Sequence, residues 1–169
     1  IDLPFNLITQ VLITANDSFP LMAIPFFILA GDIMGKGGIS QRLFKVANSF
    51  VGHYTGGFAI AAILTAMFFA AISGSGPATV AAIGSIMIPE MVKRGYDKAF
   101  ATAVVAAAGT IGIVIPPSIP MVIYGVSANV SIGDIFLSGI MPGVLMGLGL
   151  IIWAVIYAKK HKFEKSQKA

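Results

Sequence analysis

The distribution of charged residues constrains this chain more than any other feature of its sequence. No Asp, Glu, Lys or Arg occurs in the 44 residues between Lys45 and Glu90, the 35 between Lys98 and Asp134, or the 24 between Asp134 and Lys159. A helix needs about 20 mostly apolar residues to cross a bilayer. Only 11% of the residues are charged and 57% are hydrophobic, whereas a soluble domain carries about 25% charged residues. The sequence therefore predicts an all-α integral membrane protein.

The basic residues predict how the chain crosses the membrane. All eleven Lys and Arg residues lie within 36–45, 93–98 and 159–168. Because basic loops stay in the cytoplasm, the three clusters belong on one side. The predicted segments are a transmembrane helix with an interfacial arm helix (1–55), a helical hairpin (56–92), a discontinuous transmembrane helix (93–127), a transmembrane helix (128–158) and a basic cytoplasmic tail (159–169). The net charge is +4, and the lysine-rich tail indicates contact with anionic lipids of the bilayer rather than a nucleic-acid patch.

The segment 56–92 contains a Gly- and Ser-rich turn between two apolar stretches. Residues 73–77 read SGSGP, which predicts two helices joined by a tight tip. Pro89 is expected to end the second arm at Ile88, which leaves roughly 18 Å of helix. Charge placement does not separate two full spans from a re-entrant hairpin, but this short arm favours the re-entrant form. The plainer interpretation is a loop between two ordinary transmembrane helices.

A second interruption follows in the apolar helix that starts near residue 99. Residues 109–120 read GTIGIVIPPSIP, and two glycines with three prolines do not sustain a regular helix. We therefore expect unwound, hydroxyl-bearing backbone at 73–79 and at 109–118, both near the membrane midplane. A broken helix facing such a tip is how secondary transporters build ion and substrate sites. Exposed carbonyls suit Na⁺, and helix-start amides suit an anion.

At these residues the chain resembles a known family. The stretch 19–157 is similar to the large membrane subunit (M subunit) of tripartite ATP-independent periplasmic (TRAP) transporters of the dicarboxylate and sialic acid type. The phrases that support the resemblance are FFILAG at 26–31, SGSGPAT at 73–79, IPPS at 115–118 and GDIFLSGIMPG at 133–143. The resemblance implies the N-terminal half of that subunit, in the bacterial inner membrane.

The resemblance also implies a mechanism and partners. It implies elevator-type, Na⁺-coupled symport of a small organic acid, with Na⁺ as coupling ion and no other cofactor. The implied partners are a soluble periplasmic substrate-binding protein, the small membrane subunit Q, and the C-terminal half of the same subunit, which contains an inverted repeat. The implied substrate- and ion-binding residues are Ser73, Gly74, Ser75, Gly76, Thr79, Gly109, Thr110, Gly112, Pro116, Pro117 and Ser118. Among these, Na⁺ is expected at Ser73, Ser75, Gly109, Gly112 and Ser118.

Other functions remain to be weighed against this one. An elevator-type transporter that needs no binding protein is one alternative, and a channel-type membrane subunit is another. We expect no enzyme, because a midplane serine nucleophile needs a base within reach and both histidines, His53 and His161, are predicted near the cytoplasmic edge. Asp32 and Glu90 are expected as interfacial acids at membrane ends rather than as a proton relay. The first residue is not Met, and no basic signal-peptide start is present, so we expect a longer polypeptide.

Overall fold

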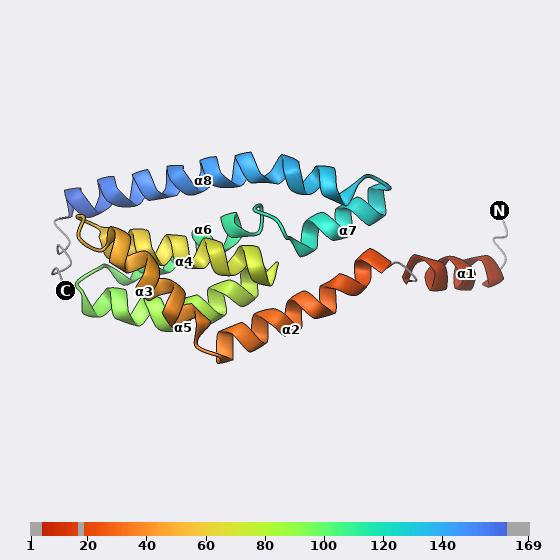
Figure 1. The fold of residues 1–169 in the computed structure, drawn as a ribbon, viewed down its shortest axis with the longest axis horizontal. Helices are drawn as coiled ribbons and strands as arrows, with labels where there is room; N and C mark the ends of the chain where they lie inside the picture. Colours follow the sequence, from red (N-terminus) through yellow and green to blue (C-terminus); the bar gives the residue numbers. More distant parts are fainter. Residues whose placement is uncertain (1–4, 17–18, 162–169) are drawn as a thin grey trace.

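The computed structural model describes residues 5–16 and 19–161, and every helix or strand assigned in these ranges is a helix. The elements in chain order are α1 (Phe5–Asn16), a short 3₁₀ helix η1 (Phe19–Met22), α2 (Ala23–Lys36), α3 (Ile39–Val51), α4 (Gly57–Ser73), α5 (Gly76–Lys93), α6 (Lys98–Gly112), α7 (Ile119–Ala128) and α8 (Ile132–Lys160). Figure 1 shows α8 running along one side of the molecule, with the α4–α5 hairpin beside it. The all-α prediction is confirmed.

Short polar side chains and prolines mark where several helices begin. The Asp97 carboxylate accepts a hydrogen bond from the Phe100 N–H at the start of α6 (3.0 Å), and the Ser131 hydroxyl accepts one from the Asp134 N–H at the start of α8 (3.3 Å). Both bonds satisfy amides that have no partner within the helix. Pro120 lies in the first turn of α7, where its missing N–H costs no helical bond.

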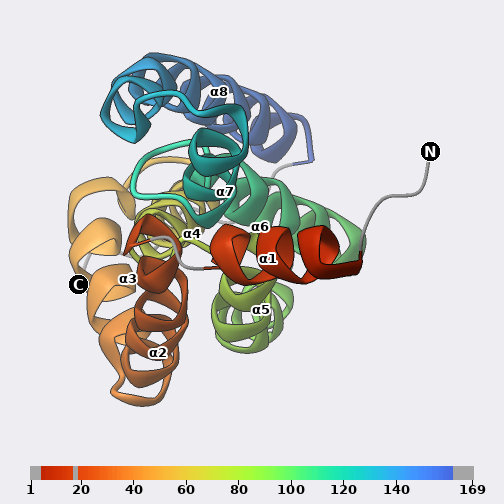
Figure 2. The ribbon, with the colours of Figure 1, turned by 90° about the vertical axis from the view of Figure 1, so that its right-hand side faces the viewer.

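Helix α4 forms the centre of the helical body. Viewed end-on, α3, α5, α6 and α8 surround it (Figure 2). Of its 17 residues, 13 are buried, as expected for a helix that is apolar all round. Five of the buried residues are alanines: Ala59, Ala61, Ala62, Ala66 and Ala70. Such small residues let neighbouring helix backbones approach closely, which is how helices associate in a membrane.

Helix α8 packs against both halves of the broken helix. It has 29 residues and three buried glycines spaced four apart, and each glycine lies against a side chain from another element. The pairs are Gly139 with Met121 of α7, Gly143 with Ile115 of the α6–α7 connection, and Gly147 with Met67 of α4. A Cβ at any of these glycines would collide with its partner. Glycine therefore lets α8 join α7, the break and the hairpin in one packed unit.

Three boundaries differ from the sequence prediction. The prediction that Pro89 ends the second hairpin arm is wrong, because α5 continues through it to Lys93. Pro89 is exposed, and a proline inside a helix can kink it without ending it. The unwound segment is also shorter than predicted. Gly109, Thr110 and Gly112 belong to α6, and only residues 113–118 lack helical structure.

The hairpin tip is likewise tighter than predicted. Only Gly74 and Ser75 lie between α4 and α5, so Gly76 to Thr79 form the first turn of α5 rather than unwound backbone. Glycine and serine are compatible with a helical first turn, and Pro77 is favourable there.

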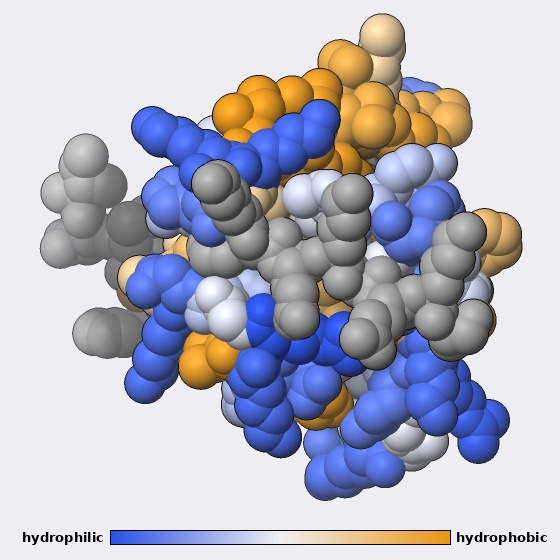
Figure 3. Space-filling view, turned by 90° about the vertical axis from the view of Figure 1, so that its left-hand side faces the viewer, coloured by the Kyte–Doolittle hydropathy of each residue, from blue (hydrophilic) through white to orange (hydrophobic). Residues whose placement is uncertain are grey.

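Several features of the described residues agree with an integral membrane protein. The stretch 19–36 and α8 are each long and apolar enough to cross a bilayer, and α4, α6 and α7 are shorter apolar helices. Large apolar side chains are exposed on both long elements, with Phe26 of α2 67% exposed and Leu137 of α8 70% exposed. Hydrophilic side chains gather at the end of the molecule where α5 and α8 end and α6 begins (Figure 3).

Candidate functional site

The hairpin tip is a two-residue turn at the end of α4. Gly74 has a φ of +66°, and its N–H donates to the Ala70 carbonyl at 2.8 Å. A side chain at this position would be strained, which is why glycine occupies it. Ser75 then caps α5, where its hydroxyl accepts a bond from the Ala78 N–H at 3.5 Å.

Three hydroxyl-bearing residues brace this tip from inside. The Thr79 hydroxyl donates to the Ser75 carbonyl at 2.8 Å. Since its proton is used there, Thr79 Oγ1 accepts from the Ser73 hydroxyl, which lies 3.0 Å away. The Ser73 and Thr79 side chains are buried, with 1% and 0% exposure. The predicted site residues Ser73, Ser75 and Thr79 therefore form one hydrogen-bonded cluster.

The tip lies directly against the broken helix. The Ile119 N–H, at the start of α7, donates to the Gly74 carbonyl at 3.3 Å. On the α6 side, a Cβ at Gly76 would lie 3.4 Å from the Gly109 carbonyl oxygen, and a Cβ at Gly109 would lie 2.7 Å from the Val80 side chain. Two segments about 35 residues apart in the sequence are thus in contact at the point where both contain glycine.

Ser118 is the predicted site residue with the most unusual environment. It precedes Ile119, so it adjoins the tip, and its side chain is fully buried. In the part of the chain that the structure describes, its hydroxyl has no hydrogen-bond partner. A buried polar atom without a partner is costly and rare. Such a buried hydroxyl oxygen is suited to a small cation, which prefers oxygen ligands.

The other predicted site residues lie farther from the tip cluster or face elsewhere. Thr110 is exposed and bonds its own helix at the Ala106 carbonyl (2.9 Å). Gly112 is buried against Ala70 of α4. Pro116 and Pro117 are partly buried in the connection to α7. Residues 5–16 and 19–161 contain no group of three His, Cys, Asp or Glu side chains that could hold a metal. A cation at this site would therefore be coordinated by hydroxyl and carbonyl oxygens.

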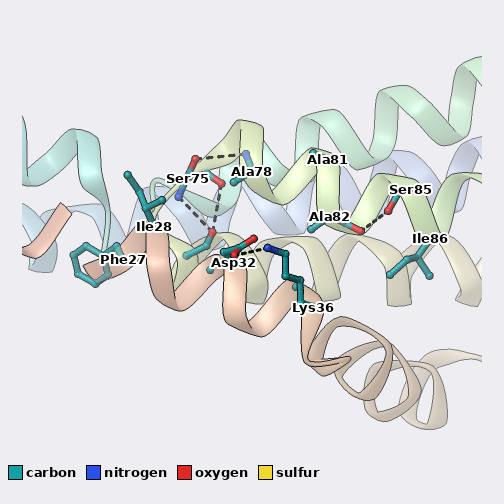
Figure 4. A pocket seen from close by; sticks show the side chains of 13 residues that line it. Phe27, Ile28, Asp32, Lys36, Ser75, Ala78, Ala81, Ala82, Ser85 and Ile86 are labelled. Atoms are coloured by element: carbon teal, nitrogen blue, oxygen red, sulfur yellow. Dashed lines mark hydrogen bonds and ion pairs between the residues drawn. The ribbon is translucent and has the colours of Figure 1, made fainter. Parts of the chain in front are cut away.

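A pocket of about 700 Å³ opens between α2 and α5 and reaches the tip. Ser73 and Ser75 line one part of it, and Asp32 and Lys36 of α2 also line it. The Lys36 ammonium lies 2.8 Å from the Asp32 carboxylate. Figure 4 shows this ion pair on α2, with Ser75 on the hairpin opposite. From the sequence, Asp32 is expected at a membrane end, with no link to Ser75.

The signal for this pair was present in the sequence. An acid and a base four residues apart on a helix face each other, and such a pair inside an apolar stretch indicates a functional position. What the sequence did not contain was the packing of α2 on the hairpin. Gly31, next to Asp32, lies against Ser73, so close that an added Cβ would be 3.0 Å from the Ser73 Cβ.

Comparison with known proteins identifies the family. The chain is 60% identical over 94% of its length to the isethionate TRAP transporter permease protein DctMQ of Oleidesulfovibrio alaskensis. It is 55% identical over 87% of its length to the C4-dicarboxylate TRAP transporter large permease protein DctM of Vibrio cholerae. It is 43% identical over 97% of its length to the sialic acid TRAP transporter permease protein SiaT of Haemophilus influenzae.

The chain spans only part of each of these relatives: 25%, 32% and 27% of their respective lengths. The family model for the tripartite ATP-independent periplasmic transporter DctM component matches residues 2–169. The chain therefore belongs to the DctM family of TRAP transporter membrane components.

Proposed function

We propose that the chain is part of the membrane subunit of a Na⁺-coupled importer of small organic acids in the bacterial inner membrane. A periplasmic binding protein would deliver the acid, and a small membrane subunit would pack beside this one. The relatives support this proposal, since their names include transporters of isethionate, C4-dicarboxylates and sialic acid. All three substrates are organic anions. The subunit would carry out transport and no covalent chemistry.

The observation on which the ion site rests is the contact between the tip and the broken helix. The Gly74 carbonyl accepts a hydrogen bond from the Ile119 N–H, and the residue just before Ile119 is Ser118, whose buried hydroxyl has no hydrogen-bond partner among the described residues. In this proposal Na⁺ is the coupling ion, and hydroxyl and backbone carbonyl oxygens are suitable ligands for it. The positive charge of the ion, with the amides at the start of α5, would favour an organic anion at the same place.

The re-entrant form of the hairpin is also part of the proposal. Ile115, in the break beside the tip, packs on Gly143 of α8. Gly143 is 11 residues after the start of α8 at Ile132, which corresponds to about 16 Å of helix. In Figure 1, α8 and α7 extend well beyond the tip. The tip therefore lies level with a point about 16 Å from the start of α8, well short of the end of that helix. This position agrees with a hairpin that enters the membrane and turns back.

The packed unit of hairpin, broken helix and α8 supports elevator-type movement. Exposing the tip to water by local unwinding would break backbone hydrogen bonds inside lipid, and each unsatisfied group there costs several kcal/mol. Movement of the unit as a rigid body avoids this cost. We therefore propose that these elements move together and carry ion and anion across.

The test is uptake of labelled organic acids into proteoliposomes that contain the complete transporter. Replacing Ser118 by Ala should raise the Na⁺ concentration needed for half-maximal uptake, because it removes a buried oxygen ligand. Ser73→Ala, Ser75→Ala and Pro117→Ala should also weaken Na⁺ dependence more than they reduce expression. Ser138→Ala is the matched control, since this exposed serine of α8 bonds only its own helix, at the Ile135 carbonyl (2.8 Å). Unchanged Na⁺ dependence in all four site variants would contradict the site.

The same assay separates the alternatives. Uptake that requires both an inward Na⁺ gradient and the binding protein supports the proposal. Gradient-driven uptake without the binding protein indicates another kind of secondary transporter. Flux that needs no gradient indicates a channel.

A further inference from the structure

The Asp32–Lys36 ion pair lies in an unexpected place for two charges. Both residues belong to the stretch 19–36, which is long and apolar enough to cross a bilayer. Both side chains are nevertheless exposed among the described residues, with relative exposures of 55% for Asp32 and 78% for Lys36. The pair therefore projects from the helical body instead of being enclosed by it.

The neighbours of this pair show that it does not lie at the basic end of the molecule. Gly31, one residue before Asp32, contacts Ser73 at the hairpin tip. Lys36 lines the same pocket as Ile86 of α5. Ile86 precedes the basic end of α5 at Lys93 by seven residues, or about 10 Å of helix. The pair lies between the tip and that end, and Figure 1 shows α2 ending beside the hairpin rather than at its base.

Charges on a stretch that is long and apolar enough to cross a bilayer are not expected to face lipid. Ionisable side chains within membrane segments face a protein interior or a water-filled cavity, because exposing them to hydrocarbon is costly. The pocket beside the pair satisfies this requirement. At about 700 Å³, it has room for roughly 20 waters at 30 Å³ each. Ser75 and Ser85 supply further polar groups on its α5 side.

A second pocket offers a contrast within the same chain. It measures about 250 Å³ and is lined by the apolar residues Leu64, Met67, Phe68, Ala71, Ile115, Val144, Gly147, Leu148 and Ile151. A cavity with no polar lining stays dry or is filled by lipid. The two pockets therefore differ in chemistry: one contains an ion pair and serines, and the other has only apolar side chains.

We propose that the pocket between α2 and α5 is a water-filled vestibule through which small hydrophilic ions reach Ser75 at the hairpin tip. In this vestibule, the Asp32–Lys36 pair sets the charge of the ions that enter. The paired charges cancel, so the intact vestibule admits cations and anions alike, as co-transport of Na⁺ with an organic anion requires. The role in transport rests on the function proposed above, whereas the presence of water in the pocket does not.

The experiment measures thiol labelling in the complete transporter in membrane vesicles. Residues 1–169 contain no cysteine, and any cysteine elsewhere in the polypeptide is replaced. Ala81→Cys places a thiol in the vestibule, and Ala71→Cys places the same group in the apolar pocket. Sulfonatoethyl and trimethylammonioethyl methanethiosulfonate are charged reagents that react only where water reaches the thiol. We expect Ala81→Cys to react at least about tenfold faster than Ala71→Cys with both reagents.

The charges of the pair are then changed one at a time in the Ala81→Cys background. Lys36→Gln leaves Asp32 alone. One charge about 6 Å away in water favours the cationic reagent about threefold and disfavours the anionic one about threefold, so the ratio of cationic to anionic labelling should rise roughly tenfold. Asp32→Asn should lower that ratio by a similar factor. The double variant removes both charges and should restore the original ratio, which also shows that the altered proteins remain folded.

Three results would overturn the proposal. In the first, neither charged reagent labels Ala81→Cys. In the second, Ala81→Cys and Ala71→Cys label at equal rates. In the third, the ratio of cationic to anionic labelling stays the same in both Lys36→Gln and Asp32→Asn. Labelling requires no transport. A transporter that lacks Na⁺ dependence but labels as expected would therefore contradict the proposed function and leave the vestibule in place, and the reverse result would do the opposite.

Discussion

The hydroxyl cluster at the hairpin tip gives the sharpest prediction about the energetics of the site. In Thr79→Val, a methyl group replaces the hydroxyl at nearly constant volume, and Thr and Val have similar helix propensities. The change removes the 2.8 Å bond to the Ser75 carbonyl and the 3.0 Å bond with the Ser73 hydroxyl. The Ser73 hydroxyl retains long contacts: it lies 3.4 Å from the Ser75 carbonyl and 3.5 Å from the Ala70 carbonyl, and it accepts from the Ser75 N–H at 3.4 Å. At 0.5–1.5 kcal/mol per bond, the expected loss of stability is about 1–3 kcal/mol.

Thr102→Val is the matched control for this change. Thr102 makes the same bond to the carbonyl four residues earlier, also at 2.8 Å, but it is exposed and water replaces that bond when the hydroxyl is lost. We expect a loss within about 0.5 kcal/mol. Thermal unfolding of the purified complete protein measures both variants. The midpoint should fall by roughly 2–4 °C per kcal/mol for Thr79→Val and stay nearly constant for Thr102→Val.

A double-mutant cycle with Ser73→Ala isolates the Ser73–Thr79 bond. The two changes together should cost about 1 kcal/mol less than the sum of the single changes, because each single change already breaks their shared bond. Equal midpoints for Thr79→Val and Thr102→Val, or strictly additive losses in the cycle, would refute the view that these hydroxyls brace the tip.

Two further predictions concern packing and pH. Gly112→Ala should destabilise the protein by about 1–2 kcal/mol, because its new Cβ collides with Ala70 and the backbone of α4. Gly149→Ala is the control and should be neutral or stabilising, since no atom lies within 4 Å of its new Cβ. Equal thermal midpoints for the two variants would contradict the close α4–α6 contact. Burial raises the pKa of Tyr96, in the α5–α6 connection, above its ordinary value of 10.0. Because the unfolded phenol ionises first as pH rises, stability should decrease from about pH 10 upward, and Tyr96→Phe should flatten this decrease in midpoints measured from pH 9 to 11.

The sequence predicted that the helices are interrupted near residues 74 and 115, but it predicted longer unwound segments than the structure has. The turn at 73–77 and the break before Ile119 both follow from local chemistry, since glycine and proline act on their own backbone. The residues around them depended on packing. Gly109 and Gly112 were predicted as unwound, but they are helical. Their glycines instead allow close contact with α5 and α4, and nothing in a single sequence distinguishes a glycine that breaks a helix from one that lets two helices touch.

Asp32 and Ser118 also illustrate which properties follow from the local sequence and which follow from packing. Ser118 was predicted as a site residue from the resemblance, within a break that its neighbouring prolines already predict, which is a local signal. Asp32 was assigned to a membrane end because charge counting along a chain assumes that each apolar run spans the membrane in order. The contact between Gly31 and Ser73 brings Asp32 close to the hairpin tip, and it arises between segments more than 40 residues apart.

By itself, the sequence determined that this chain is a helical membrane protein, where its helices are interrupted, and which residues carry hydroxyls and flexible backbone there. These properties depend on composition and on neighbours along the chain, which the bilayer and backbone hydrogen bonding constrain directly. Only the tertiary structure decided that the two interruptions meet, that the Ser118 hydroxyl has no hydrogen-bond partner within residues 5–16 and 19–161, and that an ion pair lines a pocket leading to Ser75. Such contacts depend on which helix faces pack together, and a membrane, in which lipid is as apolar as the helix surfaces, leaves that choice to small residues and close fit.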